Sequence, residues 1–275
     1  MQVLRYNRAG IPTVSNPATR PPWIGAFMST PAVPPVTPEA PGLSEGARLV
    51  NVFAAPSSTF TDLQRNASWW VPWLIMSIVT LIFVGVMQKQ IGFDRIVRTQ
   101  ISKNAAAQDR FDKLPPDQRD RQIAIQVTVT KYLSYASPII LLISFAIISA
   151  ILMALFNFGL GAEVPYGRSF AITVYAYLPS LIASILGIVV MFFADPDGFD
   201  VQNPVATNLG AIVDQSHKFL HTFLTGIDIF NIWIMVLLAI GFSSNSKVKR
   251  GTAFATIFGS FLVWKLVTAG FAAMF

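Results

Sequence analysis

Two charged residues lie inside long apolar stretches near the C-terminus, and they are the residues best placed to do chemistry. Asp228 lies about 14 residues before Phe242, or roughly 21 Å along a helix. Lys265 lies about 12 residues after Ala253, or roughly 18 Å along the next one. A short turn joins the two stretches, so their helices are antiparallel and the two charges are expected to meet.

This pair allows two interpretations. An unpaired charge at the centre of a bilayer costs a few kcal/mol or more, and pairing removes much of that cost. Asp228 and Lys265 therefore form either a proton or ion relay or a structural pair that fixes the register of the last two helices, with Asn231 as a further partner. A relay needs a chain of ionisable groups, which the other apolar stretches do not supply, and this favours the structural pair.

A second cluster has the spacing of a weak metal site. Asp214, His217 and His221 follow the pattern i, i+3, i+7, so they share one face of a helix. Two histidines four residues apart can bind a divalent metal. Because the cluster offers only one further ligand and no glutamate base, the alternative is an interfacial helix leading into a span.

An acidic loop resembles a calcium-binding loop in part. Asp195, Asp197 and Asp200 alternate with other residues, but Gly198 comes two positions early and no glutamate closes the set at position twelve. The alternative is a solvated acidic loop.

The sequence contains no pattern typical of an enzyme. It has no cysteine, which excludes disulfides, thiolate metal sites and cysteine nucleophiles, and it has only two histidines. Gly-rich phosphate loops, serine nucleophile elbows and paired catalytic carboxylates are also missing. We therefore predict no catalytic residue and no cofactor.

The composition predicts an integral membrane protein. Hydrophobic residues make up 53% of the 275 residues and charged residues only 12%, against about 25% charged in soluble domains. The apolar blocks are continuous for about 20 residues, which favours transmembrane helices over barrel strands. The net charge of +6 lies mostly in loops beside these blocks, which favours contact with lipid head groups and disfavours nucleic acid.

The blocks predict an all-α, polytopic bundle of about five transmembrane helices. The expected spans cover residues 69–87, 137–158, 170–193, 222–242 and 253–275. Pro179 is expected to kink the third span, and Gly187 is expected to allow close packing there. Between the first two spans, residues 88–136 are expected to form two polar helices joined by a proline turn, with Asp117 capping the second.

The first 42 residues differ from the rest in being rich in proline. They predict a disordered tail, and residues 43–275 form the membrane domain. Met28 opens a plausible alternative start of the protein. Residues 43–60 predict either an interfacial helix, broken at Pro56, or a short linker helix packed on the membrane domain.

Basic residues beside the spans predict the orientation. Lys247, Lys249 and Arg250 fill the last turn, and short basic loops favour the cytoplasm. This places the N-terminus in the cytoplasm and the C-terminus outside, in the cell membrane, which is the inner membrane in a bacterium. The basic residues of the long first loop oppose this orientation, and we give the short loops precedence.

Three segments carry a resemblance to a known family: residues 48–60 with the tryptophan cluster at 69–73, residues 170–179, and residues 228–233 with Gly241. In this order they resemble bacterial members of the Yip family, relatives of the Ypt/Rab-GTPase-interacting membrane proteins. The resemblance covers roughly residues 43–275. It implies a bundle of five spans with a cytoplasmic N-terminus.

The resemblance also bears on function. Eukaryotic relatives are implicated in vesicle traffic and Rab GTPase association, but their typical Asp-Leu-Tyr-Gly-Pro motif is missing here, so no GTPase-binding residue is carried over. The leading hypothesis is a non-enzymatic membrane scaffold or trafficking-like factor with protein partners or self-association. The alternative is a small transporter or channel that uses Asp228 and Lys265, and a membrane-embedded enzyme ranks third.

Overall fold

The computed structural model describes residues 41–193, 195, 199–201, 203–214 and 216–274, together with the backbone of two short strands near the N-terminus. The chain divides into two units, Met1–Pro41 and Gly42–Phe275. In the first unit, β1 (Arg5–Tyr6) and β2 (Pro12–Thr13) pair antiparallel. The predicted disordered tail falls almost wholly outside the described residues, and it stays a prediction.

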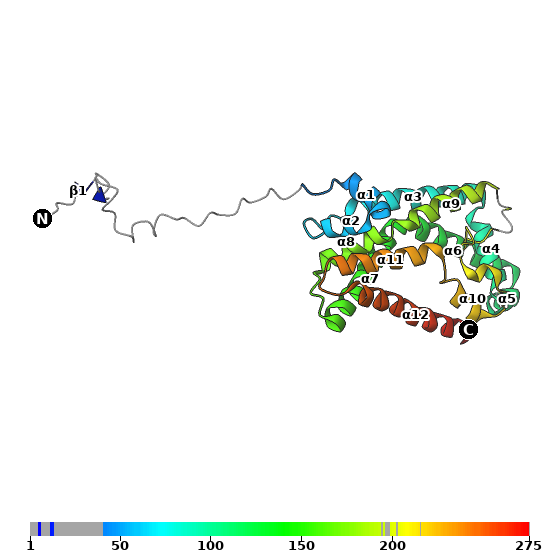
Figure 1. Cartoon of the computed structure of the whole chain (residues 1–275). Helices are drawn as coiled ribbons and strands as arrows, with labels where there is room; N and C mark the ends of the chain where they lie inside the picture. Colours follow the sequence, from blue (N-terminus) through cyan, green and yellow to red (C-terminus); the bar gives the residue numbers. More distant parts are fainter. Residues whose placement is uncertain are drawn as a thin grey trace. The chain divides into compact units, whose positions relative to one another are not determined.

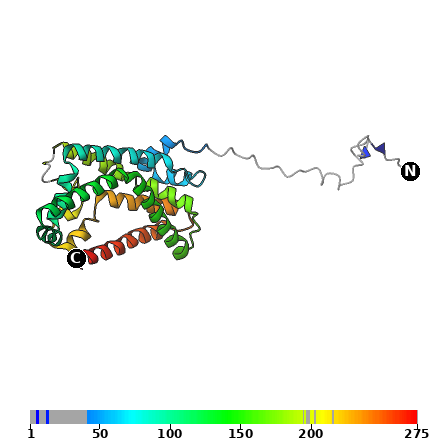
Figure 2. The same ribbon diagram turned by 180° about the vertical axis from the view of Figure 1, so that it is seen from behind.

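The second unit is built from helices. In chain order they are α1 (Glu45–Ala54), α2 (Pro56–Asp62), α3 (Trp70–Gln90), α4 (Phe93–Lys103), α5 (Ala105–Asp112), α6 (Pro116–Tyr135), α7 (Ser137–Leu160), α8 (Tyr166–Ala176), α9 (Pro179–Phe193), the 3-10 helix η2 (Leu209–Ile212), α10 (Lys218–Leu224), α11 (Ile229–Ser244) and α12 (Arg250–Met274). Figures 1 and 2 show α3, α9, α11, α7 and α12 running lengthwise beside one another.

The spans agree with an all-α polytopic membrane protein, as predicted. Within the described part of the chain, four stretches are long and apolar enough to cross a membrane: Trp70–Gln90, Ser137–Leu160, Tyr166–Phe193 and Arg250–Met274. A further apolar helix, α11, has only 16 residues. Its length is about 24 Å, less than the roughly 30 Å thickness of a hydrocarbon core. The predicted boundaries lie within a few residues of the ends of these four helical stretches. Phe275 lies outside the described residues.

The fourth span begins later than predicted. We expected one helix over residues 222–242, but α10 ends at Leu224 and α11 begins at Ile229. The break has two physical causes. Gly226 is poorly suited to a helix interior, and the Asp228 carboxylate accepts hydrogen bonds from the N–H groups of Phe230 and Asn231, which starts a new helix.

The third span is interrupted at the predicted proline. The helix α8 ends at Ala176 and α9 begins at Pro179, because proline has no N–H to continue the hydrogen-bond ladder. The expectation for Gly187 is also confirmed: a Cβ there would lie 2.9 Å from the ring of Phe83 on α3. A glycine therefore lets α3 and α9 approach closely.

The long polar loop contains one helix more than predicted. Asn104 ends α4 and caps α5 by accepting a hydrogen bond from the N–H of Ala107 at 3.1 Å. The predicted proline turn separates α5 from α6. However, Asp117 lies in the first turn of α6, and the N-cap position belongs to Pro115, so the prediction of an Asp117 cap is wrong.

The hydrophobic core lies around α8. Every residue of α8 from Ser169 to Ala176 is buried, and the rings of Phe156 on α7 and Phe242 on α11 stack with centroids 4.3 Å apart nearby. In contrast, most large side chains of the second half of α12 are exposed. Such an exposed apolar surface is compatible with lipid, because lipid tails are as apolar as these side chains.

Candidate functional site

The α1–α2 hairpin is packed onto the bundle. Val52 on α1 and Phe60 on α2 are fully buried in the same core as α8. A Cβ on Gly241 of α11 would lie 2.4 Å from Cγ2 of Ile172 and 3.1 Å from the Phe60 ring. Only glycine at this position lets α11, α8 and α2 meet. Of the two alternatives for residues 43–60, the structure shows the linker that packs on the membrane domain. The predicted break at Pro56 is confirmed.

A buried ion pair holds the hairpin closed. Arg48 Nε donates to Asp62 Oδ2 at 2.7 Å, and the two side chains are only 3% and 7% exposed. The other Asp62 oxygen accepts from the N–H of Leu43 at 3.1 Å. Thr59 donates its hydroxyl to the carbonyl of Arg48. These bonds satisfy both ends of a charge pair whose desolvation would otherwise be costly.

The hairpin is tied to α8 by a tyrosine. The Tyr175 hydroxyl donates to Glu45 Oε2 at 2.9 Å, while Glu45 Oε1 accepts from Arg48 Nη1 at 3.3 Å. Because Tyr175 is fully buried, its hydroxyl needs such a partner. Burial lowers the pKa of Arg48, but the hydrogen bond and the negative charge of Asp62 outweigh it, and the pKa lies above its ordinary value. Arg48 is therefore permanently charged.

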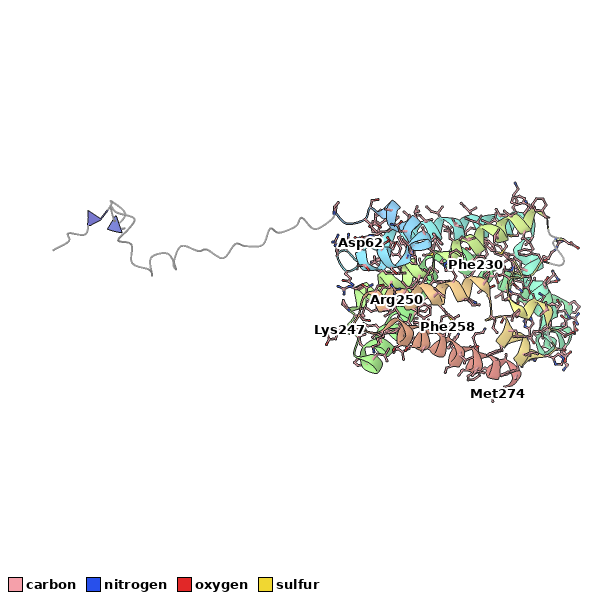
Figure 3. The ribbon with its side chains drawn as sticks, in the orientation of Figure 1. Asp62, Phe230, Lys247, Arg250, Phe258 and Met274 are labelled. Carbon is pink, nitrogen blue, oxygen red and sulfur yellow. The ribbon has the colours of Figure 1, made fainter. Side chains whose placement is uncertain are left out.

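A polar contact joins the hairpin to the basic turn after α11. The buried Asn245 donates from Nδ2 to the carbonyls of Phe60 at 2.8 Å and of Gly241 at 2.9 Å. Arg250 Nη2 donates to the Ser57 hydroxyl at 3.0 Å. Figure 3 shows Asp62, Lys247 and Arg250 at one end of the bundle and Met274 at the other.

The structure does not bring Asp228 and Lys265 into an ion pair. The Asp228 carboxylate caps α11 and accepts a hydrogen bond from the Thr207 hydroxyl. The aliphatic stem of Lys265 instead packs against the backbone of Gly226, where a Cβ would lie 2.2 Å from Cε. Asn231 donates to the carbonyl of Gly226 at 3.4 Å. All three residues therefore lie at or beside the interruption between α10 and α11. The role of the two charges stays a prediction.

The weak metal candidates do not form a ligand cluster. Asp214 is exposed and accepts from the N–H of Ser216 at 2.7 Å, and His217 precedes α10 while His221 lies within it. Within the described ranges, no group of three His, Asp or Glu side chains is close enough to hold a metal. The pKa of Asp214 lies below its ordinary value, first because of the Ser216 N–H and then because of the Ser216 hydroxyl.

The calcium-like loop is described only in part. Asp200 lies 3.0 Å from Lys103 Nζ on α4 and forms an ion pair with it. Asp197 lies outside the described residues, so the predicted set of three stays a prediction.

Comparison with known proteins identifies the family. The family model of the Yip1 domain matches residues 50–273. The chain belongs to the Yip1 family. This confirms the resemblance found in the sequence, including the bacterial type. This Yip1-family chain is 24% identical over 230 residues to "Membrane protein YknW" of Bacillus subtilis (strain 168), a match that covers 81% of this chain and 90% of YknW. No solved structure matches it.

Sequence reasoning about this Yip1-family chain missed the buried Arg48–Asp62 ion pair and the contact between Tyr175 and Glu45. Arg48 lies in the first segment that carries the resemblance, but its partner Asp62 has no local signal of burial, and nothing local links Tyr175 to Glu45. The available signal is the position of Arg48. Arg48 and Val52 are four residues apart, so Arg48 lies on the same face of α1 as the buried Val52. The matched family region begins at residue 50 and includes Asp62 and Tyr175, while Glu45 and Arg48 precede it.

Proposed function

We propose that this Yip1-family protein is a non-enzymatic membrane scaffold whose α1–α2 hairpin presents a fixed surface to protein partners. The buried Arg48–Asp62 ion pair carries the proposal, because it holds the hairpin closed, while the buried Val52 and Phe60 hold the hairpin on the bundle. A surface that is already ordered loses little conformational entropy when a partner binds. Recruitment of this kind requires no catalytic group and no cofactor.

The outward face of α1 is the surface that we assign to partners. Gly46, Val50 and Ala54 repeat every four residues, so they share one side of the helix, opposite the buried Val52. The Val50 side chain is 65% exposed although it is apolar. Its partner is either another protein or a second copy of this chain.

Charge supports a cytoplasmic position for this surface in the cell membrane. The hairpin end of the bundle carries the basic residues Arg48, Arg65, Arg168, Lys247, Lys249 and Arg250 and the acidic residues Glu45, Asp62 and Glu163. The long loop of residues 88–136 at the other end carries more lysines and arginines, which opposes this orientation, and we again give the short turns precedence. Loops rich in lysine and arginine stay in the cytoplasm, so we place the N-terminus inside and the C-terminus outside.

Cross-linking in native membranes followed by co-purification tests the scaffold. We expect Val50→Glu to remove partners that the unaltered protein retains, because the charge would be buried at the contact. Gln118→Glu adds the same charge to an exposed position at the opposite end and is expected to retain them. The proposal fails if no co-purifying protein or second copy depends on Val50, or if Gln118→Glu causes the same loss.

The break between α10 and α11 favours a second function, a small transporter or channel. Irregular backbone at membrane depth is typical of segments that line a water-filled cavity, and broken helices are common at transport sites. Here the break contains Asp228 and lies against Lys265 of the last span. In proteoliposomes, a transporter predicts flux that depends on pH or potential and is abolished by Asp228→Asn. A scaffold predicts no flux in either protein.

A further inference from the structure

A large cavity opens at the end of the bundle opposite the α1–α2 hairpin. Its volume is about 1190 Å³, and we call it the α10 cavity. Its walls come from α4, the end of α9, residues within 199–201 and 203–213, α10 and Ala272 near the end of α12. Pockets for small molecules typically have about 300–1,000 Å³, so the α10 cavity has room for a sizeable ligand or for part of one.

The cavity wall carries positive charge. Lys103, Lys218 and His221 line it, together with Asp200. Lys103 is already paired with Asp200 at 3.0 Å. The ammonium of Lys218, in contrast, has no ion-pair partner within the described part of the chain. The uncompensated charge therefore lies on α10, where an incoming anion would meet it.

A second lysine lies behind the same wall. Lys265 and Ala272 are seven residues apart, so they lie on the same face of α12, and Ala272 lines the cavity. The Lys265 stem packs on Gly226, which follows the lining residue Thr225. Among the described side chains, none forms a hydrogen bond or ion pair with the Lys265 ammonium. Its charge therefore adds to the attraction of the cavity for anions.

The surroundings of the cavity are apolar and exposed, which indicates contact with lipid. Large exposed apolar side chains lie within two positions of its lining residues on three elements: Ile212, Phe219, Leu220, Phe271 and Met274. With 25 residues, α12 is about 37 Å long. This exceeds the roughly 30 Å of the hydrocarbon core, so its end reaches the level of the head groups. A hollow with both polar and apolar lining, beside exposed apolar side chains at this level, fits an amphiphile.

We propose that the α10 cavity binds the head group of an anionic phospholipid. Lys218 and His221 contact the phosphodiester, Lys265 adds long-range attraction, and the acyl chains lie along the exposed side of α12. A soluble phosphate ester would offer the same anion, but the apolar border favours the lipid. This site lies at the opposite end from the proposed partner surface, and it does not rest on the scaffold function.

Native mass spectrometry of the full-length protein in neutral detergent tests the proposal. After removal of native lipid, the protein is titrated with phosphatidylglycerol or phosphatidylcholine. We expect preferential binding of phosphatidylglycerol and a loss of roughly fivefold in its affinity for Lys218→Gln, the size expected for one basic residue near a lipid surface. Lys249→Gln, at an exposed position of the opposite end, is expected to bind as the unaltered protein does.

Further arms of the experiment separate the sources of the anion. Equal binding of phosphatidylcholine, or equal weakening by Lys249→Gln, would overturn the proposal. Competition by glycerol 3-phosphate in the same concentration range as phosphatidylglycerol would also overturn it, because the ligand would then be a soluble anion. Lys218→Arg keeps the charge and is expected to retain binding, which separates loss of charge from damage to α10.

Discussion

The guanidinium of Arg48 and the carboxylate of Asp62 meet across the α1–α2 hairpin, with Nε and Oδ2 2.7 Å apart. Arg48 lies on α1 and Asp62 is the last residue of α2. Their ion pair therefore closes the hairpin at its open side. The fully buried Phe60 and Val52 fix the same hairpin on the bundle. The ion pair thus closes the hairpin, and the buried apolar side chains hold the closed hairpin on the bundle.

Arg48→Met is expected to open the hairpin. It leaves the Asp62 carboxylate buried without its cation, which costs about 3–5 kcal/mol in comparable sites. The measurement is protease cleavage in detergent within residues 43–62, which should become much faster. Arg98→Met is the matched control, because the Arg98–Asp94 pair is more than half exposed and is worth at most about 1 kcal/mol.

The double variant Arg48→Met with Asp62→Leu tests the reason for this loss. It removes both charges, so no uncompensated carboxylate remains, and replacement of a buried pair by apolar groups is often neutral. We expect cleavage to return most of the way to the rate of the unaltered protein. If the double variant is cleaved as fast as Arg48→Met, the buried Asp62 charge is not the cause.

Gly241→Ala is expected to destabilise the bundle by about 1–3 kcal/mol, the usual range for overpacking. The new methyl group would lie 2.4 Å from Cγ2 of Ile172, so α11 must move away from α8. Gly251→Ala is the control, since a Cβ there meets nothing within 4 Å. The two variants are compared by their thermal unfolding midpoints in detergent. Equal midpoints would contradict the close contact at Gly241.

The spans could be predicted from the sequence because each is a continuous apolar block. The break at 225–228 could not, because Phe223 and Leu224 continue the apolar composition upstream of Asp228. Hydropathy does not distinguish an aspartate inside a span from an aspartate that caps a helix. The presence of Gly226 two residues earlier was the available signal for a cap.

The hairpin network could be predicted only in part. The break at Pro56 is a local effect, and proline in the first turn of a helix is recognisable in the sequence. The contact between Tyr175 and Glu45 joins residues 130 positions apart, and no local pattern encodes it. Such contacts follow from packing of α8 against α1, which composition and periodicity do not specify.

Asp214 is expected to titrate below the ordinary aspartate pKa of about 3.9. The Ser216 N–H, and then the Ser216 hydroxyl, stabilise the charged form and lower the pKa. A group whose folded pKa is lowered adds stability above its unfolded pKa, and this stability is lost as pH falls through the folded pKa. Carboxyl NMR titration measures the value. Ser216→Ala should raise the pKa of Asp214 part of the way to its ordinary value, since the N–H remains. A pKa at or above the ordinary value in the unaltered protein would contradict the hydrogen bonds from Ser216.

Asp228 is expected to act on stability through its oxygen atoms and not through its charge. Asp228→Ala removes the acceptor for the N–H groups of Phe230 and Asn231, and loss of such a cap costs about 0.5–2 kcal/mol. Asparagine is also a good cap, so Asp228→Asn should retain most of the stability. Thermal unfolding in detergent measures both variants. If Asn and Ala lose the same amount, the negative charge itself is required, and a charge interaction with Lys265 becomes the better explanation of this residue.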